Sequence, residues 1–259
     1  MAGATQALRV GSLVLSNDYR HPVMLAKEIA TLDVLSNGRV ELGLGAGFSK
    51  VEYDRAGMSF DPPGVRVDRL EESLHVLKGL FGAGPLTFAG KHYTVTGLDG
   101  FPKPVQRPHP PILIGASGKR MLSIAAREAD IIGFQTVTTA NGSMSDDPRN
   151  RLAPAVSQKV EQVRQVAGER FGEIELSLVM TVVLDEARRE AAERFARERG
   201  WEGISAEQIL EMPSVFIGSV DRIVDEMRAR RDRYGFSYYV VLDHTVEKVM
   251  PIVARLAGT

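Results

Sequence analysis

The sequence predicts an α/β protein with parallel strands. Short apolar segments alternate with longer segments of helical periodicity, and glycine, proline and asparagine punctuate the connections between them. Such alternation gives either a (β/α)8 barrel or a doubly wound sheet. Six strands fit the doubly wound sheet without adjustment, whereas a closed barrel needs two more. The six candidate strands are residues 8–15, 39–45, 111–116, 130–135, 175–184 and 236–242.

The first βαβ unit is the clearest element of the chain. Leu8–Leu15 reads as a strand, and Pro22 suits the first helical position, where its missing N–H is not needed. Apolar residues recur at helical spacing as far as Asn37-Gly38, where glycine takes the left-handed conformation cheaply. Residues 40–45 then alternate between leucine or valine and glycine or glutamate, which is the period of a strand. A crossover of this kind joins parallel strands.

The remaining segments continue the alternation, with two irregular stretches. Residues 48–64 are rich in glycine, proline and aspartate and predict a loop, and residues 136–152 predict a long mobile loop. An insertion at about 85–110 contains a β-hairpin, followed by an irregular stretch because residues 97–111 hold five prolines. A capping box begins at Ser205. Helices are expected within 67–81, 121–128, 156–163, 186–199, 219–227 and 246–256, and a short helix is expected to begin at the capping box 205–208.

Composition excludes several classes of function. The 259 residues are 44% hydrophobic and 25% charged, which is ordinary for a globular protein, and the length suits one large α/β domain or two small ones. The formal net charge of −1 gives no electrostatic support for binding nucleic acid or an anionic membrane. The absence of cysteine excludes disulfides and thiolate chemistry. No 18-residue apolar run or signal peptide is found, so the expected location is cytoplasmic.

Several motifs carry a family resemblance. The stretch VGSLVLSNDYRHPVMLAKEIATLDVLSNGRVELGLGAGF resembles the third and fourth βα units of the bacterial luciferase-like superfamily. The stretches GVRVDRLEESLHVLKGLF, LTFAGKHYTV and FPKPVQRPHPPILIGASGKRMLSIAAREADIIGF resemble the units that follow. The most specific parts are PxPVQxPxPPIxIG before a strand and the strand end LGLGAG. The chain looks most like the branch that uses the deazaflavin coenzyme F420. The resemblance implies one luciferase-like TIM-barrel domain over residues 1–259.

The same resemblance implies an incomplete barrel. A full member has two further βα units before Leu8, about 60–70 residues at the usual size of such repeats. Residues 1–5 look like the tail of the second helix, so six barrel strands are expected and the first two βα units are expected to be missing. Both a truncated chain and a natural short form fit. In full members the absent second strand supplies contacts to the flavin ring and, in some, a catalytic histidine.

The resemblance also places a cofactor site. It implies a strand bulge with a non-prolyl cis peptide at Ser12-Leu13, packed against the flavin ring, and a backbone at Ala46 and Gly47 that lies close to the ring or tail. A plain barrel strand and an ordinary tight turn are the structural alternatives. The turn of Gly115, Ala116, Ser117 and Gly118 opens a helix, whose N-terminal N–H groups favour a phosphate. An ordinary capped βα turn is the alternative here.

The candidate acids and bases in the sequence do not identify the reaction. His21 reads as a helix cap, His244 stands beside Asp243 after the last strand, and the other histidines read as structural. Neither HExxH nor HxxxH occurs, so a metal site is not expected. Phe48 stands where some deazaflavin dehydrogenases carry a glutamate, and no catalytic residue is assigned.

Three hypotheses of function follow. The leading one is a coenzyme F420-dependent oxidoreductase that moves hydride between the deazaflavin and a small organic substrate. The alternatives are an FMN-dependent monooxygenase and, from another class, a non-catalytic barrel remnant that binds cofactor or dimerises. A homodimer is expected, with no nucleic-acid or membrane partner.

Overall fold

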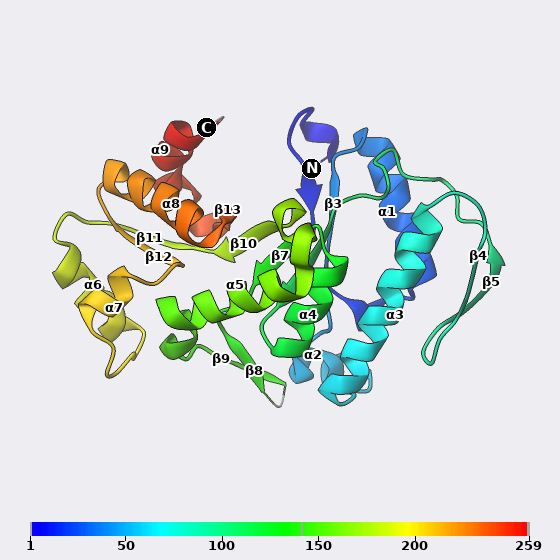
Figure 1. Cartoon of the computed structure of the whole chain (residues 1–259), viewed down its shortest axis with the longest axis horizontal. Coiled ribbons are helices and arrows are strands. Elements are labelled where there is room, and N and C mark those ends of the chain that lie inside the picture. The colour runs from blue at the N-terminus through cyan, green and yellow to red at the C-terminus, as the bar shows by residue number, and fades with distance from the viewer. Residues whose placement is uncertain (1, 141, 258–259) are drawn as a thin grey trace. The chain divides into compact units, whose positions relative to one another are not determined.

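The chain forms two compact units of parallel strands and covering helices. The computed structural model describes residues 2–140 and 142–257, without the side chains of 138–140. The first unit comprises residues 1–116, 124–132 and 141–143, and the second comprises 117–123, 133–140 and 144–259. Figure 1 traces the chain through its elements. Within the described ranges no helix is both long enough and apolar enough to cross a membrane.

The strand order decides between the two architectures that the sequence left open. The main sheet runs β1-β3-β6-β7-β10-β13, and β2 also pairs with β3. Strands therefore follow one another in chain order, as in a barrel, whereas a doubly wound sheet reverses its order at a switch point. The predicted half-barrel with six strand positions is confirmed. Its strands are β1 (Val10–Gly11), β2 (Leu15–Ser16), β3 (Val40–Gly45), β6 (Ile112–Ala116), β7 (Ile131–Phe134), β10 (Glu175–Val179) and β13 (Phe236–Val240).

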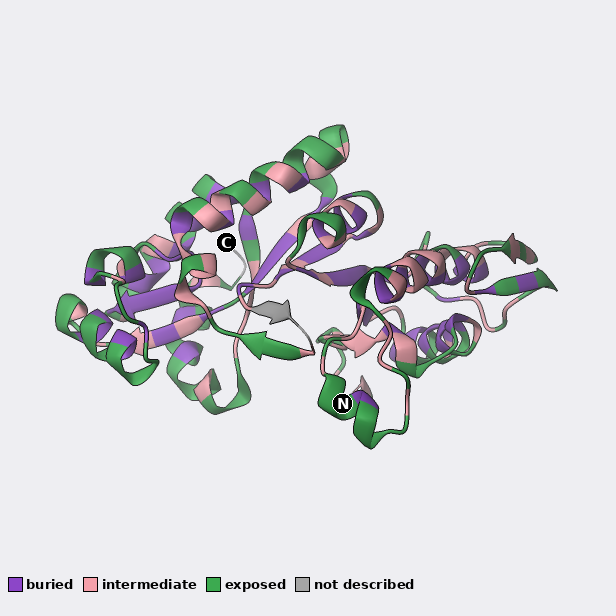
Figure 2. Cartoon of the chain, turned by 90° about the horizontal axis from the view of Figure 1, so that it is seen from below, coloured by how far each residue is buried: buried purple, intermediate pink, exposed green. Residues whose placement is uncertain are grey.

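The first unit buries its strands beneath two long helices. Strand β3 is buried along its whole length, and Figure 2 shows the strands mostly in the buried colour while the helices carry one buried and one exposed face. His21 caps the first helix by accepting the Val23 N–H at 3.3 Å, which confirms its reading as a cap. Helices α1 and α3 pack side by side (Figure 1). These helices are α1 (Pro22–Ser36) and α3 (Pro63–Phe81).

Gln106, in the proline-rich motif, forms hydrogen bonds that connect two elements of the first unit. The Gln106 side chain donates to the Asp33 carboxylate at 2.7 Å and to the Val40 carbonyl at 2.8 Å, while its backbone N–H reaches the same carboxylate at 2.9 Å. Asp33 is fully buried in α1. The motif PxPVQxPxPP thus joins α1 and β3, and its glutamine satisfies a carboxylate that would otherwise be costly to bury.

Two sequence predictions for the first unit need correction. Residues 48–64 were expected to be a loop, but they contain helix α2 (Lys50–Arg55), which is stabilised by a Lys50–Asp54 ion pair and by burial of Tyr53. The predicted strand 8–15 is interrupted at residues 12–14, because the Ser12 side chain bonds the Gly43 backbone there. The predicted hairpin is confirmed as β4 (Leu86–Ala89) and β5 (Thr94–Leu98), which pair antiparallel.

The second unit pairs β10 with β13 in parallel, and the helices α5 to α9 belong to it. The predicted strand 175–184 divides at Met180, since β10 pairs with β13 and the continuing β11 (Thr181–Leu184) pairs with β12. Strand β12 (Val215–Gly218) was not predicted, because its buried run is only four residues long. The capping box at Ser205 is confirmed. The helices are α5 (Ala153–Ala167), α6 (Arg188–Glu198), α7 (Ala206–Leu210), α8 (Val220–Tyr234) and α9 (Val246–Leu256).

Short elements fill the stretch that was predicted to be a long mobile loop. A two-stranded sheet of β8 (Thr138–Ala140) and β9 (Ser143–Ser145) is followed by a 3-10 helix (Pro148–Arg151), which Asp147 caps at the Arg149 N–H. The absence of regular structure was therefore a wrong prediction, while its mobility stays a prediction and residue 141 lies outside the described residues. Helix α4 (Lys119–Glu128) connects β6 to β7.

Candidate functional site

The register of the first unit brings predicted cofactor residues to one edge of the sheet. Leu15 pairs with Leu44, and Leu44 pairs with Ile114, so β2, β3 and β6 end side by side. Ala46 and Gly47 follow β3 directly, and Gly115 and Ala116 close β6. The carboxyl ends of parallel barrel strands are where active sites are built. The residues therefore lie at the edge of the sheet where a cofactor site is expected, and their role in binding a cofactor stays a prediction.

Ser12 and Gly43 interlock where the first strand is interrupted. The Ser12 hydroxyl donates to the Gly43 carbonyl at 3.0 Å and accepts the Gly43 N–H at 3.1 Å. A Cβ at residue 43 would lie 1.9 Å from the Ser12 carbonyl oxygen, so only glycine fits there. The cis peptide bond joins Leu13 and Val14, one residue later than predicted. Leu13 itself is 56% exposed.

Gly47 makes room for a buried tyrosine. Its φ of +75° is left-handed, and an added Cβ would lie 2.1 Å from the Tyr53 hydroxyl and 2.8 Å from the Ser16 hydroxyl. The sequence analysis assigned this glycine to close approach of a cofactor. The packing of Tyr53 gives a sufficient reason for glycine within the protein itself, and the cofactor role stays a prediction.

Arg66 fixes the carbonyl groups of the same turn. Its guanidinium donates to the Ala46 carbonyl at 3.1 Å and to the Gly47 carbonyl, and it stacks 4.3 Å above the Phe60 ring. Arg66 is only 6% exposed. A planar guanidinium can hold two carbonyls and an aromatic face together, so the path of the chain after β3 is rigidly defined. Arg66 could not be singled out from the sequence, because an arginine inside an amphipathic helix gives no separate signal.

A buried polar cluster lies beside that turn. Asp18 accepts the Tyr53 hydroxyl at 2.9 Å and pairs with Arg69 at 3.4 Å, and Arg69 also pairs with Asp61. The Asp18 side chain is 1% exposed. Burial raises the pKa of Tyr53 to about 12, and the Asp18 carboxylate acts in the same direction. Tyr53 therefore stays protonated at neutral pH as a hydrogen-bond donor rather than serving as a base.

This cluster was also missed from the sequence. Asp18 and Asp61 stand in polar loops, where aspartate is common for reasons of turn chemistry. Asp61 is only eight positions from Arg69, but Asp18 reaches Tyr53 across 35 positions of the chain and also pairs with Arg69. Such contacts leave no periodic trace in the sequence.

The turn after β6 supplies the candidate phosphate site. Helix α4 begins at Lys119, and the Leu122 N–H bonds the Gly118 carbonyl at 2.9 Å. A Cβ at Gly118 would meet no described atom within 4 Å, so the space beside the helix start is open. The boundary between the two units falls after Ala116, within this turn. Ser117 and Gly118 thus retain their predicted position at a helix N-terminus.

Parallel strands in chain order, with an interrupted first strand and glycines at the end of β3, define a barrel-type α/β protein. Comparison with known protein families gives the same fold class and names the family. The sequence profile of the luciferase-like monooxygenase family matches residues 1–213. The chain belongs to the luciferase-like monooxygenase family.

Curated relatives divide between two cofactors. The chain is 33% identical over 188 residues to an F420-dependent glucose-6-phosphate dehydrogenase of Nakamurella multipartita, covering 72% of this chain and 52% of that protein. It is 28% identical over 200 residues to an FMNH2-dependent dimethylsulfone monooxygenase of Pseudomonas putida, covering 76% and 54% respectively. The chain thus spans about half the length of the curated relatives it matches.

Solved structures support the fold. Monooxygenase RslO1 from Streptomyces bottropensis superposes with a TM-score of 0.71 at 19% identity, covering 99% of this chain and 79% of that one. The coenzyme F420-dependent tetrahydromethanopterin reductase from Methanopyrus kandleri gives 0.70 at 21% identity, covering 98% and 83%. At these identities the likeness concerns the fold alone.

Proposed function

We propose that this chain is part of a coenzyme F420-dependent oxidoreductase that transfers hydride between the deazaflavin and a small organic substrate. The observation that carries the proposal is the 33% identity to an F420-dependent dehydrogenase over 72% of this chain, against 28% to the FMNH2-dependent monooxygenase over a similar share. A second F420-dependent dehydrogenase, from Amycolatopsis mediterranei, is 28% identical over 88% of this chain.

The residues present fit such a cofactor. The open space beside Gly118 admits a phosphate at the start of α4, where backbone N–H groups and the helix dipole favour an anion. Leu13, exposed beside β3, offers an apolar surface of the kind that packs against a ring. When bound, the deazaflavin supplies the hydride chemistry. The protein would hold the phosphate, orient the ring and exclude water.

Arg66 and Tyr53 have positioning roles in this proposal. Arg66 holds the carbonyls of Ala46 and Gly47, so the backbone that would face the cofactor is defined before binding. Tyr53 keeps its proton and anchors Asp18 and Ser16 behind the same turn. Preorganisation of this kind reduces the ordering cost of binding. Neither residue is assigned a step in the reaction.

The FMN-dependent monooxygenase is the second candidate. It is favoured by the relatives from Pseudomonas putida and Pseudomonas fluorescens, which are FMNH2-dependent monooxygenases. Phe48 also favours it, because this residue, 39% exposed after the β3 turn, cannot act as the carboxylic acid that some deazaflavin dehydrogenases carry there. Both candidates are oxidoreductases, and they differ in the cofactor that the chain should prefer.

Cofactor preference can be measured directly. Titration of the purified chain with F420 and with FMN, followed by fluorescence, should give a lower Kd for F420. A lower Kd for FMN would move the proposal to the monooxygenase. Saturable binding of neither cofactor by a chain with folded circular dichroism would overturn both and leave only the non-catalytic barrel remnant that dimerises.

A matched pair of substitutions tests the phosphate position. Gly118→Asp adds a side chain and a charge where space is open, and Gly118→Asn adds nearly the same shape without the charge. Two charges ~6 Å apart at an effective dielectric of ~20 interact by about 3 kcal/mol, which corresponds to roughly a hundredfold in Kd. We expect that loss for the aspartate variant only. Equal affinities for the two variants would place the cofactor phosphate elsewhere.

A further inference from the structure

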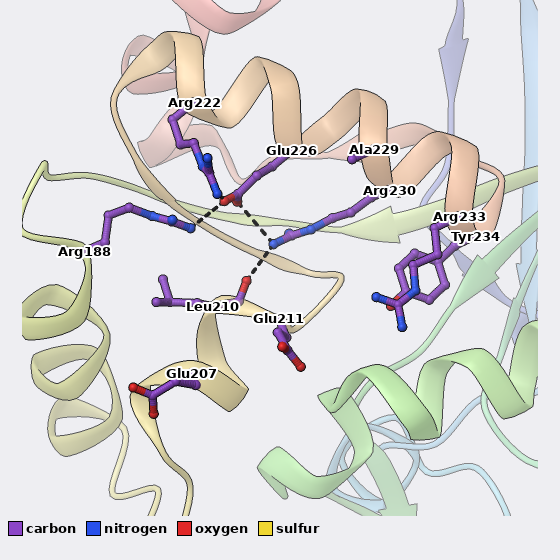
Figure 3. A pocket seen from close by; sticks show the side chains of 10 residues that line it. All are labelled: Arg188, Glu207, Leu210, Glu211, Arg222, Glu226, Ala229, Arg230, Arg233 and Tyr234. Carbon is purple, nitrogen blue, oxygen red and sulfur yellow. Dashed lines mark hydrogen bonds and ion pairs between the residues drawn. The ribbon is translucent and has the colours of Figure 1, made fainter.

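A cavity in the second unit is formed by residues of α6, α7 and α8. It has a volume of about 400 Å³, which is within the size range of small-molecule sites. Figure 3 shows its lining, with arginines from two helices directed toward one glutamate and a tyrosine at the other end. None of its lining residues belongs to the proposed cofactor site.

One wall of the cavity has more positive charge than its acidic partner can balance. Arg188, Arg222 and Arg230 all contact the single carboxylate of Glu226, with Arg222 at 3.0 Å and Arg230 at 3.4 Å. The Glu226 side chain is 14% exposed and that of Arg230 is 9% exposed. Three guanidinium groups on one carboxylate leave a net charge of +2.

Arg230 is the structural member of this group. It donates to the carbonyls of Val215 at 2.6 Å and Leu210 at 3.0 Å, and it stacks 3.9 Å above the Phe216 ring. Burial lowers its pKa, although the arginine remains charged at any physiological pH. Its role is to hold α7 and β12 against α8. The cavity's capacity for a ligand therefore depends on the other cationic groups.

The opposite end of the cavity has donors without partners. Among the described residues, the Arg233 guanidinium has no hydrogen bond or ion pair and lies only over the Tyr234 ring, 5.0 Å from its centre. The Tyr234 hydroxyl is buried without a hydrogen-bond partner in that same set, and the residue is 4% exposed. A buried, unpaired hydroxyl is costly, and a bound acceptor would remove that cost.

The acidic residues of the lining reduce this charge only in part. Glu207 pairs with Arg189 at 2.7 Å, so its charge is already compensated. Glu211, on the α7 side of the cavity, has no ion pair within the described residues and opposes an anion. The four lining arginines against Glu226 and Glu211 leave a net charge of +2, which suits a dianion rather than a cation.

We propose that this cavity binds a small organic phosphate. The phosphate dianion accepts from Arg233 and from the Tyr234 hydroxyl, and the net charge of the cluster around Glu226 attracts it. The cavity is larger than an inorganic phosphate needs, and Leu210, Ala229 and the Tyr234 ring provide apolar surface for an organic group. The site is independent of the proposed cofactor site, and neither proposal rests on the other.

Calorimetric titration of the full chain with phenyl phosphate tests the proposal. We expect saturable binding that is tighter than for inorganic phosphate and absent for phenol. Arg233→Gln and Tyr234→Phe should each weaken binding about tenfold, as expected for one lost charge-assisted hydrogen bond. Tyr234→Phe should not lower the melting temperature, because the hydroxyl has no partner to lose. Glu211→Gln should strengthen binding several-fold, because it removes the opposing charge.

Two controls locate the effect. Arg228→Gln removes an arginine from the same helix that lies outside the cavity lining, near Asp225, and should leave affinity unchanged. Gly118→Asp should also leave it unchanged, because that residue belongs to the cofactor site. Absence of binding to the folded wild-type chain, or equal affinities for Arg233→Gln and Arg228→Gln, would overturn the proposal.

Discussion

Replacing Gly47 by alanine should destabilise the first unit through two separable effects. The first is conformational, because φ at residue 47 is +75°, a region that costs an L-residue about 1–2 kcal/mol. The second is steric, because the new methyl group would lie 2.1 Å from the Tyr53 hydroxyl oxygen and 2.8 Å from that of Ser16. Tyr53 is only 1% exposed and cannot swing away.

The magnitude follows from these two terms. Overpacking of a filled site costs about 1–3 kcal/mol, so the total for Gly47→Ala is about 2–5 kcal/mol. Gly57→Ala is the matched control, since φ is +67° there and no described atom lies within 4 Å of the added carbon. It should show the conformational cost alone, which is about 1–2 kcal/mol.

A double variant isolates the contact. Tyr53→Phe removes the hydroxyl that the new methyl group would meet, which leaves the ring carbon that carried it at 3.1 Å. In a double-mutant cycle measured by urea unfolding and circular dichroism, Tyr53→Phe should recover at least about 1 kcal/mol of the Gly47→Ala loss. Equal losses for Gly47→Ala and Gly57→Ala, with no coupling to residue 53, would refute the steric argument.

Two further predictions concern the hairpin and the edges of the sheet. Glu72 accepts the backbone N–H groups of Lys91, His92 and Tyr93 at 2.8, 2.8 and 3.0 Å. Burial raises the pKa of Glu72, but these hydrogen bonds outweigh burial and hold the pKa below 4.5. The stabilisation from these bonds is therefore complete above pH 4.5 and is lost as the pH falls through the lowered pKa. Glu72→Gln should remove this acid sensitivity from the amide exchange of residues 91–93; an unchanged pH profile would contradict the prediction. The second prediction concerns the edges of the sheet, because β1 and β13 stand at the two ends of the strand order. Large apolar side chains are exposed in each unit, with Leu8 66% exposed in the first and Met250 56% exposed in the second. Two βα units added before residue 1 should raise the melting temperature and cofactor affinity together, whereas a glycine–serine extension of equal length should not; equal effects would show that these edges need no partner strands.

The sequence by itself determined the kind and order of the main elements. Pro22, the capping box at Ser205 and the alternation in residues 40–45 act through local backbone preferences, so their structures could be predicted without knowledge of the fold. The family resemblance supplied the barrel architecture and the approximate position of the cis peptide. It erred by one residue because no local signal distinguishes Ser12-Leu13 from Leu13-Val14.

Only the tertiary structure decided what the polar residues do. Asp18, Tyr53 and Arg69 converge through contacts between distant segments, and Gln106 reaches Asp33 across 73 positions of the chain. The arginines around Glu226 were not singled out from the sequence, and the contact between α6 and α8 brings Arg188 and Arg222 to one carboxylate. Helical periodicity fixes which face a charge occupies, but the partner it meets depends on how the helices pack, which the local sequence does not encode.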